Sequence, residues 1–490
     1  MKKRVVIVGA GMGGLSAAVA LSGRPQLEVT LLEAAPQSGG KVGFHEYDGV
    51  RFDTGPSLLT LPGVLTSLME EKGRRLQEEL TLFRPEPVFR YDFPGGEGFD
   101  VGSSPEDTEA NIRRELGEKA ASEFDEFLGY TKKIWEAASP HFVMGGAPTA
   151  LTAVKLGLTA MKAFRNIDSM STMVQAIDRR ITDRRLRSVF LRYATFNGSD
   201  PRRAPATLNC ISWVDLGIGG WGVEGGMYEI AKGLQRVAQE GGVECCFHRA
   251  ITSIERRDNG YRVSWGDGAM DADAVVVNAD VRHFIEDLWQ EKSDHGVSVD
   301  EPLSTSGFNA VIRARRRPAE ERAAHAVVFP ERDYMEEFVD LFDRRIPPSK
   351  PAIYLCAKEK AHRASGWADH EPLFVMANAP AIDETGSSTN WVDFEEKVML
   401  RLREKGHIDD DDQVIWRRTP QGLADAFPGS RGSLYGSASN SRFAAFKRPP
   451  NRAPGVPGLY LASGSAHPGG GVPLCIQSGR QAAAELLKDL

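Results

Sequence analysis

The feature that most constrains the fold is a glycine-rich segment between two short apolar runs near the N-terminus. The run Val5–Val8 leads into the pattern G-x-G-x-x-G at residues 9–14, and the spacing after it predicts a helix over Leu15–Ser22. A second apolar run, Val29–Leu32, ends at Glu33, 19 residues after the last of these glycines. Continuously apolar runs of this length are typical of parallel strands that are buried on both faces. The segment therefore predicts a β–α–β unit of the Rossmann type, and with it an α/β fold.

Each residue type in this unit has a physical reason that points to a dinucleotide. Gly9 permits the tight turn, Gly11 lets a pyrophosphate approach the backbone, and Gly14 lets the helix pack on the strand. We expect Gly13 beside the free N–H groups of the helix N-terminus, which attract phosphates. Glu33 is placed to accept a hydrogen bond from a ribose hydroxyl, and an acid at this position favours FAD or NAD over NADP.

Two elements that follow separate FAD from NAD. The first is Ser38–Val42, which contains Gly39-Gly40-Lys41, and the second is Arg51–Ser57, which ends in Gly55-Pro56-Ser57. From the residues alone, Gly39-Gly40 is equally an ordinary turn. Together the two elements resemble those of the flavin amine-oxidase and phytoene-desaturase superfamily. The resemblance implies that the glycine pair crosses near the FAD diphosphate and that the cofactor contacts Gly40, Lys41, Gly55, Pro56 and Ser57.

The C-terminal stretch carries a second glycine-rich motif. A strand predicted over Leu459–Ala462 delivers a loop that runs to Pro473, and a helix is predicted to start near Gln477. Such a loop brings further backbone N–H groups to the far end of the cofactor. The string from His467 to Pro473 resembles the flavin motif of bacterial phytoene desaturases, and it is most similar to the carotenoid 3,4-desaturase branch. The resemblance assigns the flavin contacts to Gly464, Ser465, Gly471, Val472 and Pro473, although Ser463 and Ser465 stand where the family pattern has Gly and related oxidases have Asp.

The middle of the chain predicts two insertions into the flavin domain. Segments 193–206 and 219–227 are similar to stretches of the carotenoid desaturases, and strands are predicted over Ile251–Ile254, Tyr261–Trp265 and Ala274–Asn278. The resemblance places the backbone at Ile251 beside the adenine. We therefore expect FAD-binding segments at 1–80, 216–300 and 431–490, a mostly helical insertion at 81–215, and a second insertion at 301–430 that completes an α+β substrate domain.

Residues 141–192 are the candidate membrane-associating region. His141–Phe164 combines apolar positions with Lys155 and Lys162, which suits either an interfacial helix or a buried helix of the substrate domain. Asp178–Arg192 carries six arginines, which suits either a solvated helix face or attraction to anionic lipid. The basic N-terminus imitates a secretory signal, but the glycines at 9–14 interrupt its apolar stretch. The resulting expectation is a cytoplasmic, peripherally membrane-associated protein with no membrane-spanning helix.

Composition narrows the partners further. The formal net charge of −7 argues against a nucleic-acid binder. Five cysteines without a C-x-x-C pair indicate a reduced chain with no disulfide framework and no metal site.

No hydrolytic triad or paired-carboxylate pattern stands out, which fits an enzyme whose cofactor performs the redox step. The family resemblance implies FAD-dependent removal of two hydrogens from a C–C bond of a carotenoid, with hydride passing to flavin N5 and a proton leaving. The expected reaction is C-3,4 desaturation of an acyclic or 1-hydroxy carotenoid, with oxygen or a quinone reoxidising the flavin. His467 is the candidate side chain near the flavin, either as a base or as an orienting group.

Several alternatives remain open at this point. Within the family they are a multi-step phytoene-type desaturase and an oxygenase of terminal methyl groups. Outside it they are a soluble amine oxidase, which should show an aromatic cage and a buried lysine near the flavin, and a non-catalytic carrier of prenyl lipids.

Overall fold

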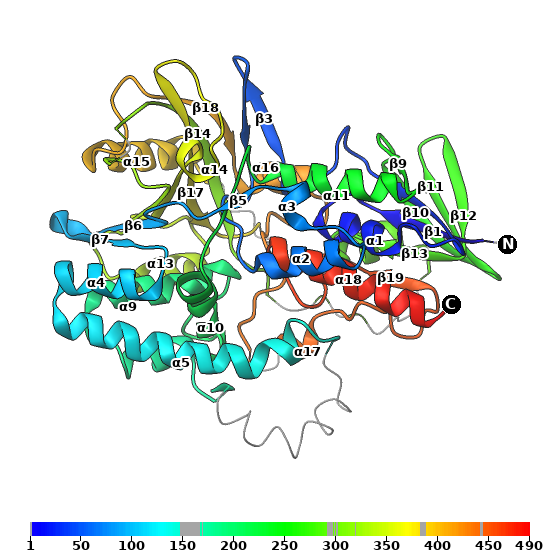
Figure 1. Ribbon diagram of the computed structural model, residues 1–490, viewed down its shortest axis with the longest axis horizontal. Helices are drawn as coiled ribbons and strands as arrows, with labels where there is room; N and C mark the ends of the chain where they lie inside the picture. Colours follow the sequence, from blue (N-terminus) through cyan, green and yellow to red (C-terminus); the bar gives the residue numbers. More distant parts are fainter. Residues whose placement is uncertain are drawn as a thin grey trace.

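A parallel sheet occupies one half of the molecule and carries the N-terminal glycine segment (Figure 1). The computed structural model describes residues 2–147, 167–168, 170–291, 297, 299, 302–318, 320–382, 389–441 and 444–490. In spatial order the five strands are β19 (Leu459–Leu461), β13 (Ala274–Val277), β1 (Lys3–Val8), β2 (Leu27–Leu32) and β9 (Glu244–Cys246). They come from three distant parts of the chain, so the chain leaves this sheet and returns to it twice.

The central strand β1 is covered on both faces, as its apolar run predicts. Val5 and Ile7 pack into a core with helices α1 (Met12–Leu21), α11 (Tyr228–Glu240) and α18 (Val472–Lys488). Val6 and Val8 face the other way, toward an antiparallel sheet of β10 (Ile251–Arg257), β11 (Gly260–Trp265) and β12 (Gly268–Ala272). This is the doubly covered Rossmann-like arrangement expected from the sequence.

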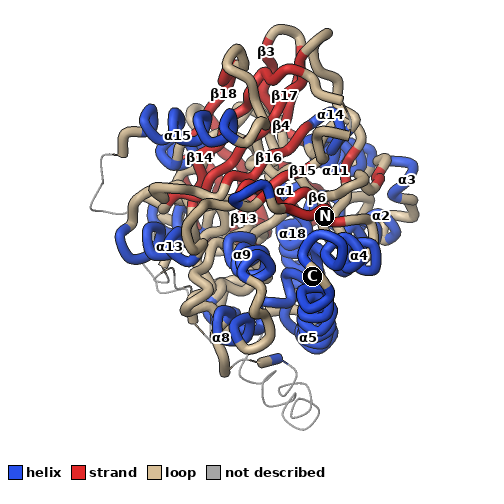
Figure 2. The backbone as a smooth tube through the Cα atoms, turned by 90° about the vertical axis from the view of Figure 1, so that its left-hand side faces the viewer, coloured by secondary structure: helices blue, strands red, loops and turns tan. Residues whose placement is uncertain are grey.

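The other half of the molecule is built on a seven-stranded mixed sheet (Figure 2). Its strands in spatial order are β18 (Gln413–Arg418), β14 (Ser306–Arg315), β17 (His370–Ala379), β16 (Ile353–Ala357), β15 (His325–Val328), β6 (Phe89–Asp92) and β7 (Gly98–Val101). Helix α15 (Trp391–Glu404) covers one face of this sheet. Helices α5 (Glu118–Phe142), α9 (Arg184–Arg192) and α13 (Met335–Val339) share a core that includes β6 and β15.

The remaining elements are short or connect these layers. They are the strands β3 (Phe44–Tyr47), β4 (Val50–Asp53), β5 (Leu82–Phe83) and β8 (Gly222–Val223), and the helices α2 (Pro62–Glu70), α3 (Leu76–Glu79), α4 (Pro105–Leu116), α8 (Met173–Asp178), α10 (Cys210–Ser212), α12 (Val281–His283), α14 (Lys358–His362), α16 (Pro420–Ala426) and α17 (Ala444–Lys447).

The first insertion is not helical throughout, because β6 and β7 lie inside it. Phe89, Tyr91 and Phe93 alternate with more exposed residues and are buried, which is the period of a strand rather than of a helix. A short 3-10 turn, Pro94–Gly96, lies between the two strands. The insertion therefore supplies an edge of the substrate sheet as well as its helices.

The last helix also begins earlier than predicted. Helix α18 starts at Val472 rather than near Gln477, with Pro473 in its first turn. Proline is favoured there because its missing N–H would have no partner in any case. Gly471 precedes the helix at φ +108°, a conformation that favours glycine.

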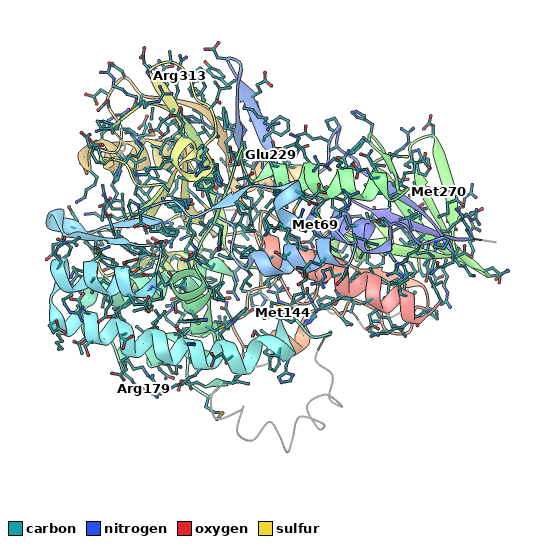
Figure 3. All side chains as sticks on the ribbon, viewed as in Figure 1. Met69, Met144, Arg179, Glu229, Met270 and Arg313 are labelled. Atoms are coloured by element: carbon teal, nitrogen blue, oxygen red, sulfur yellow. The ribbon has the colours of Figure 1, made fainter. Side chains whose placement is uncertain are left out.

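The membrane-associating region is only partly within the described residues. Residues 148–164 of the predicted interfacial segment lie outside the described residues. Met144 lies just after the end of α5 and next to α18 (Figure 3). Among the helices that the structure describes, none is long and apolar enough to cross a membrane.

The arginine-rich segment does not form one solvated or lipid-facing surface. Arg187 pairs with Asp178 and Asp333, and Arg192 is buried at 7% exposure. Arg192 is the last residue of α9. The apolar side of this helix packs into the substrate-domain core, and Arg192 is buried with it. For Arg192, both interpretations made from the sequence, a solvated helix face and attraction to anionic lipid, are therefore wrong.

Candidate functional site

The glycine segment forms a tight loop between β1 and α1. A Cβ atom on Gly14 would lie 2.0 Å from the Gly9 carbonyl oxygen, and one on Gly13 would lie 2.2 Å from the Ala462 carbonyl oxygen. Neither neighbour can move aside, because both are backbone atoms. Glycine at 14 thus lets α1 pack on its own turn, and glycine at 13 lets α1 approach the end of β19.

The second glycine pair crosses this loop. The N–H of Gly39 donates to the Ala10 carbonyl at 2.8 Å, and a Cβ on Gly40 would lie 3.1 Å from the Cα of Gly11. Three segments that are separate in the sequence thus meet at the N-terminus of α1. Its first turn holds no acidic side chain, so the free N–H groups there face no competing anion within the helix.

Glu33 lies at the same loop, beyond the end of β2. Its carboxylate accepts hydrogen bonds from the N–H groups of Ala10 at 2.6 Å and Ala35 at 2.8 Å. The N–H of Arg249 donates to the Glu33 carbonyl, which brings the start of β10 at Ile251 to this side of the sheet. A carboxylate has about four acceptor positions, so Glu33 keeps capacity for hydroxyl donors.

Lys41 runs from the glycine pair toward the C-terminal half of the chain. Its ammonium group donates to the carbonyls of Ser433 and Leu434, each at 3.1 Å. Burial lowers the pKa of Lys41, and the nearby charge of Asp280 acts in the opposite direction. Gly55 packs directly on this segment, since a Cβ there would lie 2.0 Å from the Lys41 carbonyl oxygen.

Ser57 connects the same region to the substrate domain, two residues after Gly55 and next to Pro56. Its hydroxyl accepts from the ammonium group of Lys358 at 2.8 Å, and its carbonyl accepts from Nε2 of His362 at 3.0 Å. Both partners belong to α14 of the substrate domain and are buried. The polar groups of Ser57 are therefore engaged by protein, which sequence reasoning did not foresee.

The C-terminal loop closes the site from the other end. The Ser465 hydroxyl accepts from the N–H of Val281 at 2.9 Å and lies 3.0 Å from the Ser463 hydroxyl. Gly471, Val472 and Pro473 form the N-terminus of α18, whose first turn has no acidic side chain. Apart from its chain neighbours, no atom of the described residues lies within 4 Å of the place where a Cβ on Gly471 would stand, so nothing in that part of the chain covers this helix end.

His467 lies behind this loop. Its Nε2 atom is 3.1 Å from the Gly145 carbonyl oxygen, so Nε2 carries the proton and donates it to that bond. Burial lowers the pKa of His467, which favours the neutral form of the ring. Gln477 also donates to a carbonyl of this segment, that of Met144, at 3.0 Å. The contacts of His467 are those of a group that joins the C-terminal loop to the end of α5.

Two further residues belong to the site and were not singled out from the sequence. Asn278, directly after β13, donates to the Ala462 carbonyl and lies 2.6 Å from the place of a Cβ on Gly11. Arg448 is partly buried and donates to the carbonyls of Gly464 and Ser437, and desolvation lowers its pKa to about 10. Asn278 could have been found as the polar residue that ends an apolar strand, but Arg448 has no comparable local signal.

These residues fit a bound FAD. The glycines of the loops at 9–14 and 39–40 carry no side chain that could come between their backbone and a diphosphate, and Glu33 offers carboxylate oxygens for the ribose. Lys41 and Arg448 are partly buried cations that contact backbone carbonyls, and they would supply positive charge near the flavin end. One criterion for an amine oxidase, a buried lysine, is met by Lys358, so it does not separate the two classes.

Comparisons with known proteins identify the family. Residues 12–487 match the family model described as flavin containing amine oxidoreductase. The chain is 33% identical to a hydroxyneurosporene desaturase of Rubrivivax gelatinosus, over 99% of this chain and 94% of that protein. It is 28% identical to a 4,4'-diaponeurosporene oxygenase of Staphylococcus aureus, over 99% and 98% of the two chains.

Solved structures support the same fold. A putrescine oxidase variant superposes with a TM-score of 0.64 at 16% identity, over 100% of this chain and 99% of that one. An oxidoreductase of Methanosarcina mazei does so with a TM-score of 0.62, also at 16% identity, over 99% and 100%. The chain therefore belongs to the flavin-containing amine oxidoreductase family and, within it, to the FAD-dependent carotenoid desaturases.

Proposed function

We propose that the protein desaturates the C-3,4 bond of an acyclic or 1-hydroxy carotenoid. The observation that carries this proposal is the full-length similarity to a hydroxyneurosporene desaturase, at 33% identity. The titratable side chains of the site, Glu33, Lys41 and His467, make hydrogen bonds to backbone groups of the protein. This arrangement supports redox chemistry that depends on the cofactor rather than on a nucleophilic side chain.

The chain's own residues position the cofactor and exclude water. Gly11, Gly13 and Gly40 would hold the diphosphate, and Glu33 would bind the ribose. Lys41 and the N-terminus of α18 would place positive charge beside the flavin ring. Bound FAD supplies the hydride acceptor for the oxidation of the carbon–carbon bond.

His467 is assigned an orienting role rather than that of a base. Its Nε2 proton is committed to the Gly145 carbonyl, and its side chain is buried at 2% exposure. A ring held in this way fixes the loop that carries Gly464 and Ser465 against the end of α5. Because the ring is buried and its pKa is lowered, it is a weak base, and we infer that the proton released from the substrate goes to another acceptor or to solvent.

A membrane-bound substrate implies peripheral association with a membrane surface. The apolar sequence of 141–164 with its two lysines supports this part of the proposal, together with the hydrophobic nature of carotenoids. Oxygen or a membrane quinone would then reoxidise the flavin.

Expression in hosts that accumulate different carotenoid intermediates tests the reaction. We expect a pigment with two hydrogens fewer when an acyclic or 1-hydroxy intermediate is present, detected by mass and by a shift of absorbance to longer wavelength. A host in which every intermediate stays unchanged, although flavin-loaded protein is made, would contradict the proposal.

The second candidate is oxidation of a terminal methyl group. It is favoured by the 28% identity to a diaponeurosporene oxygenase over 99% of the chain. The same pigment analysis separates the two, because this reaction adds oxygen to the product whereas desaturation only removes hydrogen.

A further inference from the structure

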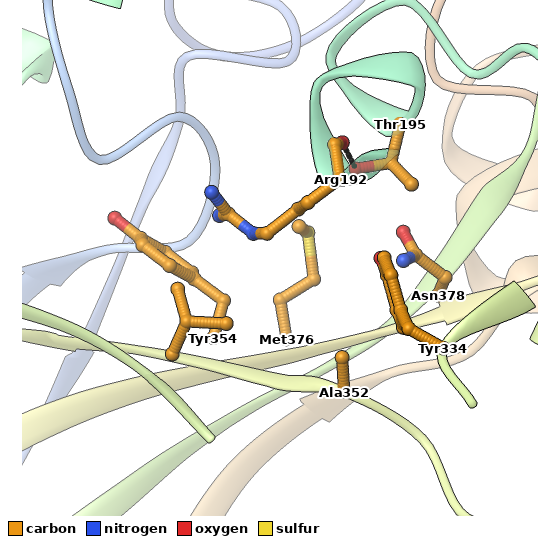
Figure 4. Close-up of a pocket in the computed structure, with 8 residues that line it drawn as sticks. Arg192, Thr195, Tyr334, Ala352, Tyr354, Met376 and Asn378 are labelled. Atoms are coloured by element: carbon orange, nitrogen blue, oxygen red, sulfur yellow. Dashed lines mark hydrogen bonds between the residues drawn. The ribbon is translucent and has the colours of Figure 1, made fainter. Parts of the chain in front are cut away.

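Helix α14 joins the substrate sheet to the cofactor half of the molecule. It follows directly from β16, a strand in the interior of the seven-stranded sheet. Figure 4 shows the side chain of Tyr354, from β16, near that of Met376 from β17, with Arg192 of α9 above them in this view. The Tyr354 hydroxyl also hydrogen bonds with Nδ1 of His325 on β15, at 2.8 Å. Strand β16 is therefore held by both neighbouring strands and provides a fixed base for α14.

Lys358, the first residue of α14, is a buried cation. It is 1% exposed, and its ammonium group donates to the Ser57 hydroxyl at 2.8 Å. The same nitrogen lies 4.9 Å from the ring centre of Phe374. Burial raises the pKa of Asp53, and the charge of Lys358 acts in the opposite direction. An uncharged side chain of similar length would fill this space at a lower desolvation cost, so packing alone does not explain a lysine here.

His362, at the end of the same helix, contacts the same serine. Its Nδ1 atom accepts from the N–H of Val223 at 3.2 Å, so the proton of the neutral ring is on Nε2, which donates to the Ser57 carbonyl at 3.0 Å. The His362 carbonyl accepts from the N–H of Gly225 at 2.9 Å. Helix α14 thus binds Ser57 through its hydroxyl and its carbonyl at once, and it also contacts the segment before α11.

Ser57 is the last residue of a short segment, 53–57, that lies against the cofactor loops. At its start, the Asp53 carboxylate accepts hydrogen bonds from two backbone N–H groups at the N-terminus of α11, at 2.7 and 3.2 Å. In its middle, a Cβ on Gly55 would lie 2.0 Å from the Lys41 carbonyl oxygen, so the two backbones are in direct contact. The cofactor half therefore holds the start and the middle of this segment, whereas α14 of the substrate domain holds its end.

We propose that Lys358 is a positioning residue, which sets the place of bound FAD by holding the hydroxyl of Ser57. The cofactor contacts expected at Gly55, Pro56 and Ser57 then keep a fixed distance from the substrate sheet, because α14 is continuous with β16. The same hydrogen bond thus sets where the flavin lies relative to a polyene bound in the substrate domain. This inference rests on the proposed function and adds to it a substrate-domain residue that acts on the cofactor through Ser57.

Release of FAD from the full-length holoprotein tests the inference. Flavin fluorescence is followed as the holoprotein is diluted, which gives the Kd of FAD. We expect Ser57→Ala and Lys358→Met each to raise this Kd by about 10-fold, because each removes the hydrogen bond between the charged donor and the hydroxyl. Ser57→Ala keeps the charge and removes one hydroxyl only, so its Kd decides the question even where Lys358→Met gives no folded protein.

The double variant shows whether the two residues act together. If Lys358 acts through Ser57, the double variant loses the same hydrogen bond only once, and its Kd should equal that of the weaker-binding single variant within about 2-fold. Two independent effects would instead multiply to about 100-fold. A lysine that merely supports the fold would give this multiplied value.

Lys360→Met is the matched control, with the same change of side chain on the same helix. The Lys360 ammonium group donates to the Arg322 carbonyl at 2.8 Å, within the substrate domain, so we expect the wild-type Kd for FAD. With FAD added to saturation, Lys358→Met and Ser57→Ala should lower kcat by about 10-fold and change KM by less than about 2-fold, because the cofactor is misplaced while the substrate-binding surface is intact.

A wild-type Kd in Ser57→Ala, or effects of the two substitutions that multiply in the double variant, would overturn the inference. Failure of the proposed function gives a different result, namely no conversion of any carotenoid by the wild type or the variants, while their Kd values for FAD still differ as expected.

Discussion

Replacing Gly479 with alanine tests how closely α18 must approach α1. A Cβ at this position would lie 2.1 Å from the Gly13 carbonyl oxygen and 2.8 Å from both the Ala17 nitrogen and the Ser16 Cβ. Unstrained contacts of this kind need about 3.5 Å, so the helices must separate by more than about 1 Å. Overpacking of this kind costs about 1–3 kcal/mol of unfolding free energy.

Gly129→Ala is the matched control. Gly129 also lies inside a helix, α5, but outside that helix's own backbone no described atom lies within 4 Å of the place where its Cβ would stand. Alanine there should raise the unfolding free energy by up to ~1 kcal/mol through helix propensity alone. The same propensity gain applies to Gly479→Ala and reduces its cost, so the difference between the two variants measures the packing.

Thermal unfolding and the flavin content of the purified protein are the two readouts. We expect Gly479→Ala to melt at a lower temperature and to retain less FAD, because Gly13 belongs to the loop that would hold the diphosphate. Gly129→Ala should melt at the same or a higher temperature with full flavin. If Gly479→Ala were as stable and as rich in flavin as Gly129→Ala, the close packing of these helices would not position the site.

Three further predictions concern the cofactor, pH and the membrane. Gly11→Val should abolish flavin retention because its Cβ would lie 2.6 Å from Asn278 Oδ1 and would displace the loop that would hold the diphosphate, whereas Gly63→Val, at an exposed glycine, should retain flavin; normal flavin in Gly11→Val would contradict the site. Burial lowers the pKa of His362 from 6.5 to about 3. The unfolded chain therefore binds a proton at this residue between those pH values and the folded chain does not, so unfolding free energy falls as pH decreases through that window, by up to ~5 kcal/mol. His362→Gln should flatten this dependence in pH-dependent denaturation, and an unchanged slope would show that His362 titrates normally in the fold. Deletion of residues 148–164 should release the protein from liposomes while its flavin remains bound, and undiminished liposome binding would refute the membrane assignment.

The sequence predicted the cofactor half of the fold well, because its signals are local. The apolar run at Val5–Val8 and the glycines after it determine a buried strand and a tight turn within ten residues. The crossing of Gly40 over Gly11 could be expected because both glycines belong to motifs of known spacing. At these positions the backbone of one segment lies so close to another that only glycine fits. A short sequence pattern therefore predicts them directly.

The substrate half was harder to predict because its contacts join distant segments. The strand around Tyr91 pairs in parallel with β15, more than two hundred residues later in the sequence. No pattern in the sequence near Tyr91 predicts this partner. Arg192 was expected at a surface because arginines surround it in the sequence. Its burial depends on the amphipathic packing of α9 against the substrate sheet, which only the assembled fold reveals.

The most direct test of the central claim is a single-turnover reaction without oxygen. Purified, FAD-loaded protein is mixed with an equimolar 1-hydroxy acyclic carotenoid in micelles, and flavin absorbance is recorded together with the mass of the product. Our account predicts loss of the oxidised-flavin absorbance in step with a carotenoid product that lacks two hydrogens. A flavin that stays oxidised with every carotenoid but is reduced by a primary amine would contradict it.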